Sequence, residues 1–387
     1  MTSGSEMPLL EQRTGNKITR TQWYNRIRCR LNLMLRPSVN DCVVDVEDLD
    51  GSDPVHMSAE FLEVSRTLSV GLVRDSDEQP YYSKFERFLK TNGIPYGYYD
   101  IHGSRWLEEA APYQVIVWRP MSNPWELEEA REKIYVLETV LKKAVYPSFH
   151  DIMLYENKLM QFFVLKQAGL PVIDSLVTCD YEEALRWIRT AHYPIVSKIR
   201  AGSSSLGVTL VRSERSARRI IEKVFRAGRA TYWPFSKQKN YVFFQKFIEN
   251  SGFDLRIVVA DNDNIFGYYR NAPRGDFRAS GYGTLTWGAL PEEAIRLAVR
   301  VRESLGIPNV SVDMLQSNAD GQFKIIELSQ FIKIDVPSEL FVNGRRGRYR
   351  YDAASDSVRF EPGMIWLQEI VLKNFLEAVC AARRGDS

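Results

Sequence analysis

The chain has 387 residues, of which 44% are hydrophobic and 26% are charged, values that are ordinary for globular proteins. Its 51 basic and 49 acidic residues leave the net charge near zero, which argues against nucleic acid as a partner. No run of about 18 apolar residues occurs, so we expect no transmembrane segment. The four cysteines form no CxxC pair, and together with a polar N-terminus they predict a cytoplasmic protein.

Residues 1–66 are expected to form an N-terminal extension. Within it, residues 20–36 hold five arginines and no acid, and their apolar residues recur at helical spacing. Such a segment can lie on an anionic membrane surface or on a partner. More often it is a helix that packs on its own domain, and the sequence leaves both interpretations open.

Residues 67–150 alternate between strand and helix patterns. Strands are predicted at 68–75, 94–101 and 113–120, and helices at 81–92 and 125–143. Alternation of this kind is typical of a small parallel sheet covered by helices.

From Tyr155 onward the pattern changes. A helix is predicted from Tyr155 to the Gly169-Leu170-Pro171 stop, and three more at 181–191, 213–226 and 291–306. Strands are predicted at 241–248, 253–260, 265–270, 310–315 and 323–328. A basic loop or hairpin at 343–361 and a closing helix at 363–384 complete the chain.

The segment 193–211 contains the most informative local pattern. Tyr193–Ile199 and Val208–Arg212 are expected to be strands, joined by small residues from Gly202 to Gly207. Glycine tolerates positive φ, so such a loop can bring backbone N–H groups close to phosphate oxygens. Lys198 supplies a positive charge at the end of the first strand. The loop is not a P-loop, because Lys-Ser/Thr and a helix do not follow it.

Two later strands each carry one acid among apolar residues, Asp313 in SVDML and Glu327 in KIIEL. A carboxylate buried without a partner is costly, so each acid needs a counter-charge or a metal ion. Mg²⁺ in nucleotide sites is held by one or two carboxylates plus phosphate oxygens. The two strands therefore predict a metal pair.

The candidate residues occur in a fixed order along the chain: Lys158, Lys198, the Asp254-x-Arg256 pair, Arg270, Asp313 and Glu327. This order resembles the ATP-grasp superfamily, and within it the carboxylate–amine ligases. The resemblance covers roughly residues 151–335. It implies an α/β (α+β) chain: an ATP-grasp fold of two α+β subdomains, preceded by a small parallel-sheet domain. The expected division is 1–66 for the extension, 67–150 for the pre-ATP-grasp domain, 151–242 for the lid subdomain and 243–387 for the metal and substrate subdomain.

The same resemblance assigns roles to individual residues. Lys158 and Lys198 would hold the α- and β-phosphates of ATP, and Asp254 the ribose hydroxyls. Arg256 and Arg270 would be catalytic residues that face phosphate or acyl-phosphate oxygens. The loop over the nucleotide would consist of Gly202, Ser203, Ser204, Ser205 and Gly207, the adenine hinge of Gln245, Lys246, Phe247 and Ile248, and the metal ligands of Asp313, Glu327 and Ser329.

Two serines depart from the family's usual residues. Glu-x-Asn is common at the second metal strand, but here Ser329 replaces the asparagine, and Ser280 replaces another asparagine in the DFRAS segment. Serine is the weaker oxygen donor, so these changes bear on how many metal ions bind.

The resemblance implies an ATP-dependent ligase that activates a carboxylate as an acyl phosphate and joins it to an amine. Mg²⁺ is the expected metal ion, with Mn²⁺ as a substitute, and the substrates are small molecules. Two alternatives remain open: a small-molecule kinase on the same scaffold, and a non-catalytic nucleotide-binding homologue. A homodimer is among the open oligomeric states.

Overall fold

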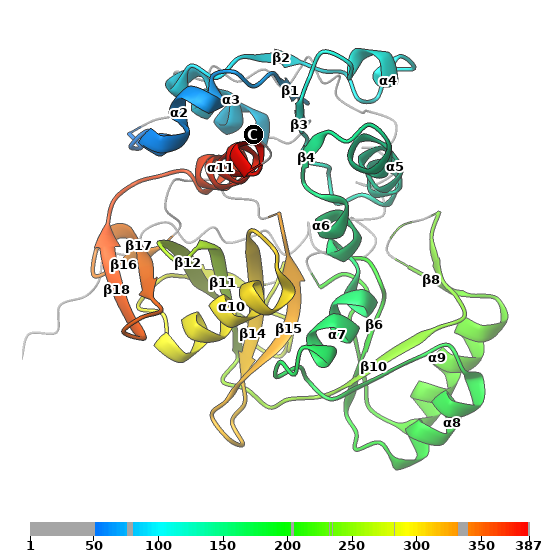
Figure 1. Ribbon diagram of the computed structural model, residues 1–387. Helices are drawn as coiled ribbons and strands as arrows, with labels where there is room; N and C mark the ends of the chain where they lie inside the picture. The colour runs from blue at the N-terminus through cyan, green and yellow to red at the C-terminus, as the bar shows by residue number, and fades with distance from the viewer. Residues whose placement is uncertain are drawn as a thin grey trace, which may run out of the picture.

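The computed structural model describes residues 51–75, 80–202, 205–231, 233, 235–281, 283–331 and 340–385. The basic segment 20–36 lies outside these residues. Figure 1 shows a parallel-sheet domain at the top, a large antiparallel sheet at the lower left, and a smaller sheet with two helices at the lower right.

The first domain has the predicted parallel sheet, with strand order β2–β1–β3–β4. Its strands are β1 (Val70–Leu72), β2 (Tyr96–Tyr98), β3 (Val115–Val117) and β4 (Ala144–Tyr146), of which β4 was not predicted. Its helices are α2 (Ala59–Ser65), α3 (Tyr81–Asn92), α4 (Trp106–Glu109) and α5 (Pro124–Tyr135), which continues as a π-helical turn, Val136–Val140. The bounds of α3 match the prediction, because Gly93 ends the helix in the left-handed region at φ +66°.

The region predicted as the lid subdomain, for which we keep that name, has a four-stranded sheet in the order β5–β10–β6–β7, and its strand β10 continues past the predicted boundary at residue 242. Its strands are β5 (Ser175–Thr178), β6 (Ile195–Lys198), β7 (Thr209–Val211) and β10 (Val242–Lys246), with a small hairpin of β8 (Arg229–Ala230) and β9 (Lys237–Gln238). α6 (Phe149–Leu154) and α7 (Lys158–Gln167) lead into it, and α8 (Tyr181–Thr190) and α9 (Glu214–Arg226) cover one face. The sheet and these two covering helices bury a hydrophobic core of their own.

The large sheet carries its side chains on two distinct faces. Its elements are β11 (Phe253–Asp261), β12 (Asn264–Asn271), β13 (Thr284–Thr286), β14 (Val310–Gln316), β15 (Phe323–Ser329), β16 (Phe341–Val342), β17 (Arg345–Asp352), β18 (Ser357–Pro362) and the helix α10 (Glu292–Leu305). Along β14, Val310, Val312 and Met314 belong to the core that includes α10. Because side chains alternate along a strand, Asp313 faces the opposite side of the sheet.

The closing helix α11 (Leu367–Gly385) returns to the first domain, where it packs against α2 and α3. An ion pair of 2.5 Å between Arg87 Nε and Glu369 Oε1 joins α3 to α11. The first domain and the large sheet thus share one hydrophobic core, which is separate from that of the lid subdomain. Across the described ranges no helix, α11 included, is long and apolar enough to cross a bilayer.

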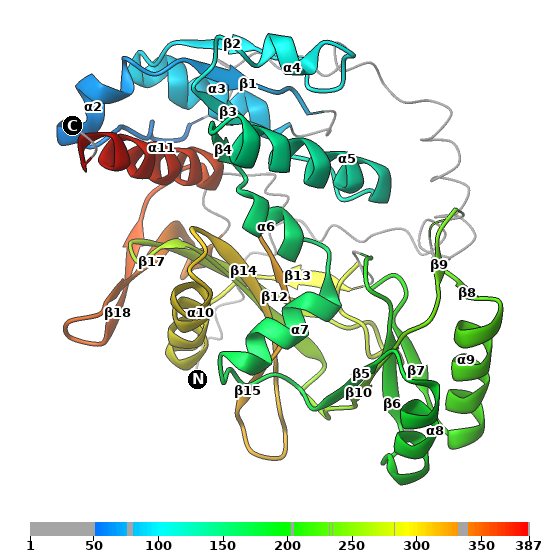
Figure 2. The same cartoon turned by 45° about the vertical axis from the view of Figure 1, so that its right-hand side comes forward.

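An aromatic contact joins the lid subdomain to the first domain. The hairpin that carries β8 and β9 extends toward α5, as Figure 2 shows. At its tip the rings of Trp233 and Phe235 lie 5.7 and 5.5 Å from that of Trp125 on α5. Edge-to-face pairs of this kind add to the stability of a contact, so the lid subdomain is held at its outer end as well as at its base.

Candidate active site

A cleft lies where the lid sheet meets the large sheet, with about 730 Å³ of empty space that includes its open mouth. The predicted site residues that line it are Lys158, Lys198, Ser205, Gln245, Lys246, Phe247, Ile248, Asp254, Arg270, Asp313 and Glu327. Residues separated by up to 169 positions in the sequence are therefore gathered around one space.

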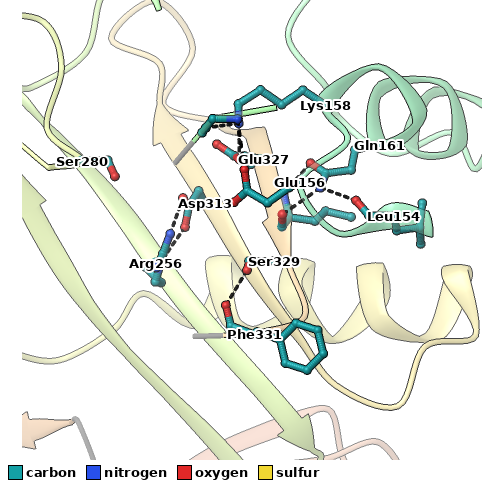
Figure 3. A network of polar contacts seen from close by, with 12 residues as sticks. Leu154, Glu156, Lys158, Gln161, Arg256, Ser280, Asp313, Glu327, Ser329 and Phe331 are labelled. Carbon is teal, nitrogen blue, oxygen red and sulfur yellow. Dashed lines mark hydrogen bonds and ion pairs between the residues drawn. The ribbon is translucent and has the colours of Figure 1, made fainter. Parts of the chain in front are cut away.

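The two acids of the predicted metal pair lie side by side. Asp313 on β14 and Glu327 on β15 are paired across the two strands, and the register shifts immediately after Asp313. Figure 3 shows both side chains on the same face of the sheet. The adjacent strands thus deliver two carboxylates to one wall of the cleft.

Asp313 forms ion pairs with two arginines. Arg256 donates to its Oδ1 from Nε at 2.7 Å and to its Oδ2 from Nη2 at 2.8 Å, and Arg270 Nη2 lies 2.8 Å from Oδ2. Burial alone would raise the pKa of Asp313, but the two guanidinium groups outweigh it and hold this pKa well below its ordinary value. The carboxylate therefore stays ionised.

Arg270 bridges the two acids Asp254 and Asp313. Its Nε donates to Asp254 Oδ1, and its Nη1 donates to Ser280 Oγ at 3.4 Å. The side chain is only 7% exposed. Burial would lower the pKa of Arg270, but the charge of Asp313 outweighs it and raises this pKa above its ordinary value.

Lys158 is the first residue of α7, whose N-cap Asn157 accepts a hydrogen bond from the Met160 amide. Its Nζ donates to Glu327 Oε1 at 2.5 Å and to the Gly202 carbonyl at 2.7 Å. Burial would lower the pKa of Lys158, but the charges of Glu327 and Glu156 raise it above its ordinary value. This ammonium group thus connects the metal-pair strand to the Gly/Ser loop.

Lys198 ends β6, and its environment differs from that of Lys158. It is buried, and Nζ lies 5.7 Å from the centre of the Phe243 ring. Within the part of the chain that the structure describes, Lys198 makes no ion pair and no hydrogen bond through its side chain. Burial lowers its pKa to about 8. An ammonium held this way is poised to accept an anionic ligand.

The predicted hairpin is present, because β6 and β7 pair antiparallel around the Gly/Ser loop. Gly202 and Gly207 have φ of +158° and +81°, and a Cβ at Gly207 would lie 2.3 Å from Ile199. These positions therefore require glycine. Ser205 lines the cleft, while Ser203 and Ser204 lie outside the described residues.

The predicted adenine hinge, Gln245 to Ile248, comprises the last two residues of β10 and the two that follow, and all four line the cleft. Gln245 donates from Nε2 to Ser175 Oγ at 3.2 Å, and the Lys246 amide donates to the Asp174 carbonyl at 2.9 Å. The ring of Phe247 lies 6.1 Å from that of Phe277, which also lines the cleft. Two aromatic rings therefore lie at this end of the cleft, and a planar base could stack on them.

Ser329 is not brought to the two acids. Its hydroxyl donates to the Phe331 carbonyl at 2.6 Å, and the residue is not among those that line the cleft. Figure 3 shows it further along β15, beyond Asp313 and Glu327. The geometry therefore gives no support to Ser329 as a third metal ligand, because its hydroxyl is directed along the backbone.

Residues 155–335 match the RimK-like ATP-grasp domain family. This part of the chain is an ATP-grasp domain. A probable alpha-L-glutamate ligase of Nitrosococcus oceani is 25% identical over 182 residues, which are 45% of this chain and 56% of that protein. A probable alpha-L-glutamate ligase of Maridesulfovibrio salexigens is 30% identical over 162 residues, 41% of this chain and 50% of that protein. The chain thus spans about half the length of the curated relatives it matches.

The D-alanine–D-alanine ligase of Bacillus anthracis has a similar fold. Its crystal structure matches with a TM-score of 0.53 over 83% of this chain and 100% of that one, at 13% sequence identity. The match extends beyond the ATP-grasp domain and includes most of the chain. It supports the predicted arrangement of a parallel-sheet domain before an ATP-grasp fold.

The ATP-grasp domain has a donor set that fits Mg²⁺. Asp313 and Glu327 offer carboxylate oxygens from paired positions on one wall of the cleft. Among the described residues, no group of three or more His, Cys, Asp or Glu side chains could hold a metal ion. A magnesium ion held by these two carboxylates would complete its ligand shell with phosphate oxygens and water, as is usual for nucleotide sites.

Sequence reasoning missed two residues that organise the ATP-grasp site. Gln161 on α7 forms two hydrogen bonds with the backbone of Leu328. Its Nε2 donates to the Leu328 carbonyl at 2.9 Å, and its Oε1 accepts from the Leu328 amide at 3.0 Å. Glu156 accepts from the Gly202 amide at 3.1 Å. No spacing rule would have identified Gln161, whereas Glu156 lies only two positions before Lys158.

We predict that nucleotide affinity depends on pH through Lys198. With its pKa at about 8, Lys198 loses its proton above that pH, while a bound phosphate favours the charged form. The affinity for ATP should therefore fall as pH rises above 8, by up to about tenfold per pH unit. Calorimetric titration between pH 7 and pH 9.5 measures this slope.

Lys198→Arg is the matched control, because a guanidinium stays protonated throughout this pH range. The slope should disappear in this variant. An equally steep slope in Lys198→Arg would show that another group is responsible.

Proposed function

We propose that this protein is an ATP-dependent carboxylate–amine ligase. The observation that carries the proposal is the cleft of the ATP-grasp domain, in which two paired carboxylates lie among buried cations. The named activity of the relatives, alpha-L-glutamate ligation, supports an acid and an amine as substrates. Because the relatives are named glutamate ligases, glutamate is the first substrate to test. The matches span about half of those relatives, so the substrate is part of the proposal.

In the proposed reaction a substrate carboxylate oxygen attacks the γ-phosphorus of ATP, and the bond to the β–γ bridging oxygen breaks. ADP leaves, and an acyl phosphate remains. The amine nitrogen then attacks the acyl carbon, inorganic phosphate leaves, and the amine loses a proton. Phosphoryl transfer of this kind depends on positioning and charge neutralisation more than on a covalent role for the protein.

The residues of the cleft would bind the nucleotide in an extended orientation. Adenine would lie against the hinge Gln245–Ile248, with the ribose near Asp254. Lys158 and Lys198 would contact the α- and β-phosphates. In this arrangement Lys158 would change partners, because its ammonium group contacts Glu327 in the structure described.

Asp313 and Glu327 would hold Mg²⁺ at the phosphate end. The ion, when bound, neutralises charge on the phosphate oxygens. Arg270 would stabilise the oxyanion of the tetrahedral intermediate, and Arg256 would keep Asp313 ionised and oriented. The Gly/Ser loop would close over the acyl phosphate and exclude water, which would otherwise hydrolyse it.

The test is an assay of ADP release with Mg-ATP and a panel of amino acids and amines. We expect ADP release that requires both an acid and an amine, with one ADP per amide bond detected by mass spectrometry. ADP release with a phosphorylated product and no amine would instead identify a kinase. Nucleotide binding without turnover across the panel would identify a non-catalytic homologue, as the serines at 280 and 329 allow.

Three further points stay predictions: Mn²⁺ as a substitute for Mg²⁺, a homodimer, and a cytoplasmic location. Activity with each metal ion and the mass in solution would test the first two.

A further inference from the structure

Glu156 has a backbone conformation that its residue type disfavours. It lies just before α7 with φ of +51°, in the left-handed region, and is only 8% exposed. This region costs a residue with a Cβ about 1 kcal/mol or more. Such a conformation persists only where the surrounding contacts hold it in place.

The contacts that hold Glu156 are shared with the Gly/Ser loop. Its Oε2 accepts from the Gly202 amide at 3.1 Å, while Lys158 Nζ donates to the Gly202 carbonyl at 2.7 Å. The Lys158 amide also donates to the Arg200 carbonyl at 3.0 Å. Three hydrogen bonds therefore fix the first part of the loop, residues 200–202, to the segment 156–158. Figure 3 shows the side chains of Glu156 and Lys158.

Gly202 is closely packed against the other end of the loop. A Cβ on it would lie 2.6 Å from the Leu206 carbonyl, so the two ends of the loop approach each other closely at this residue. The stem of the loop, residues 200–202, is thus fixed on one side by residues 156–158 and closely approached on the other by Leu206.

The two side chains that hold Gly202 differ in what else they contact. Lys158 lines the cleft and also contacts Glu327, so a bound phosphate would change its partners. Glu156 is not among the residues that line the cleft. Within the described residues it also forms no metal-binding group with Asp313 and Glu327. Its contact with Gly202 can therefore persist while Lys158 changes partner.

We propose that Glu156 is a positioning residue, which fixes residues 200–202, the stem of the Gly/Ser loop, through the Gly202 amide and thereby supports the binding of nucleotide phosphates beside Lys158. The inference rests on the proposed nucleotide site. Its first part, the fixed stem, can be measured without any nucleotide.

The first measurement is hydrogen exchange of the nucleotide-free protein. Glu156→Gly removes the acceptor and relieves the positive-φ strain, while Glu156→Gln retains an acceptor oxygen. We expect exchange of the Gly202 amide to be about tenfold faster in Glu156→Gly and close to wild type in Glu156→Gln. Lys142→Gly, at an exposed residue that also has a positive φ (+53°), is the control for relief of backbone strain and should leave this amide unchanged. Unchanged exchange in Glu156→Gly would overturn the proposal.

The second measurement is calorimetry with Mg²⁺ and a non-hydrolysable ATP analogue, beside adenosine alone. Glu156→Gly should bind the analogue about tenfold more weakly but adenosine equally well, because adenosine does not reach the loop. Glu156→Gln should restore the affinity. Equal loss for both ligands would indicate a merely structural role and overturn the proposal. If the wild type binds neither ligand, the proposed function fails, and with it the role of Glu156 toward phosphates, whereas the exchange data still decide whether it fixes the stem.

Discussion

Asp313→Asn should reduce turnover by about a thousandfold, which corresponds to about 4 kcal/mol of transition-state stabilisation. The variant should also unfold more easily, by about 3 kcal/mol. Both oxygens of Asp313 accept hydrogen bonds from guanidinium groups, and asparagine offers one acceptor and one donor. At least one N–H of Arg256 or Arg270 would then face another N–H in a buried site. Assays of ADP release and urea denaturation measure the two effects.

Glu327→Gln is the matched comparison, because it also removes a carboxylate from the metal pair. Its side chain is 24% exposed, and Lys158 would keep the Gly202 carbonyl as a partner. Turnover should fall as steeply as in Asp313→Asn, but unfolding should change by only about 1 kcal/mol. If Asp313→Asn retained wild-type turnover, the metal pair would not be part of the reaction.

The regular elements could be predicted from the sequence because local signals agree with the final packing. The Tyr81–Asn92 helix ends at a glycine, and the predicted Pro291–Gly306 helix has an apolar stripe that packs on β14. Likewise, the sequence predicts that Asp313 and Glu327 act together, because a carboxylate in an apolar strand needs a counter-charge or a metal ion, and the structure brings both to one wall of the cleft. Each of these inferences depends on neighbours within one or two elements.

What could not be predicted depends on contacts between distant segments. The neighbours of Asp313 along β14 give no sign that Arg256 and Arg270 would occupy both of its oxygens, since the pairing arises only from the strand order β14–β11–β12. The return of α11 to the first domain depends on the fit of two helix faces. The hydrogen bonds of Gln161 with the backbone of Leu328 likewise join residues that are 167 positions apart, so no local pattern predicts them.

Eight charged groups surround Asp313 and Glu327 or belong to that pair, and their formal charges balance. Four cations, at positions 158, 198, 256 and 270, lie among four acids, at 156, 254, 313 and 327. Most of them form ion pairs, so an incoming nucleotide must exchange existing partners and not simply add to free charges. Removal of any one group therefore affects its partners as well as the ligand.

Arg270→Ala illustrates this coupling. On the sequence alone it should abolish turnover and leave nucleotide affinity largely intact. The structure adds a cost, because Arg270 is the ion-pair partner of Asp254 and one of two partners of Asp313. Loss of a buried partner costs about 3 to 5 kcal/mol. We therefore expect turnover to fall by at least about a hundredfold and stability to fall by that amount.

The double variant Arg270→Ala/Asp254→Ala separates the two effects. Removing Asp254 as well eliminates the uncompensated buried carboxylate, so much of the stability should return. Turnover should remain low, because the guanidinium assigned to the oxyanion of the tetrahedral intermediate, that of Arg270, is absent. Thermal unfolding and ADP release, measured on the same samples, distinguish the outcomes. If turnover recovered together with stability, Arg270 would act only by holding Asp254, and the oxyanion would have to be stabilised by another group such as Lys198.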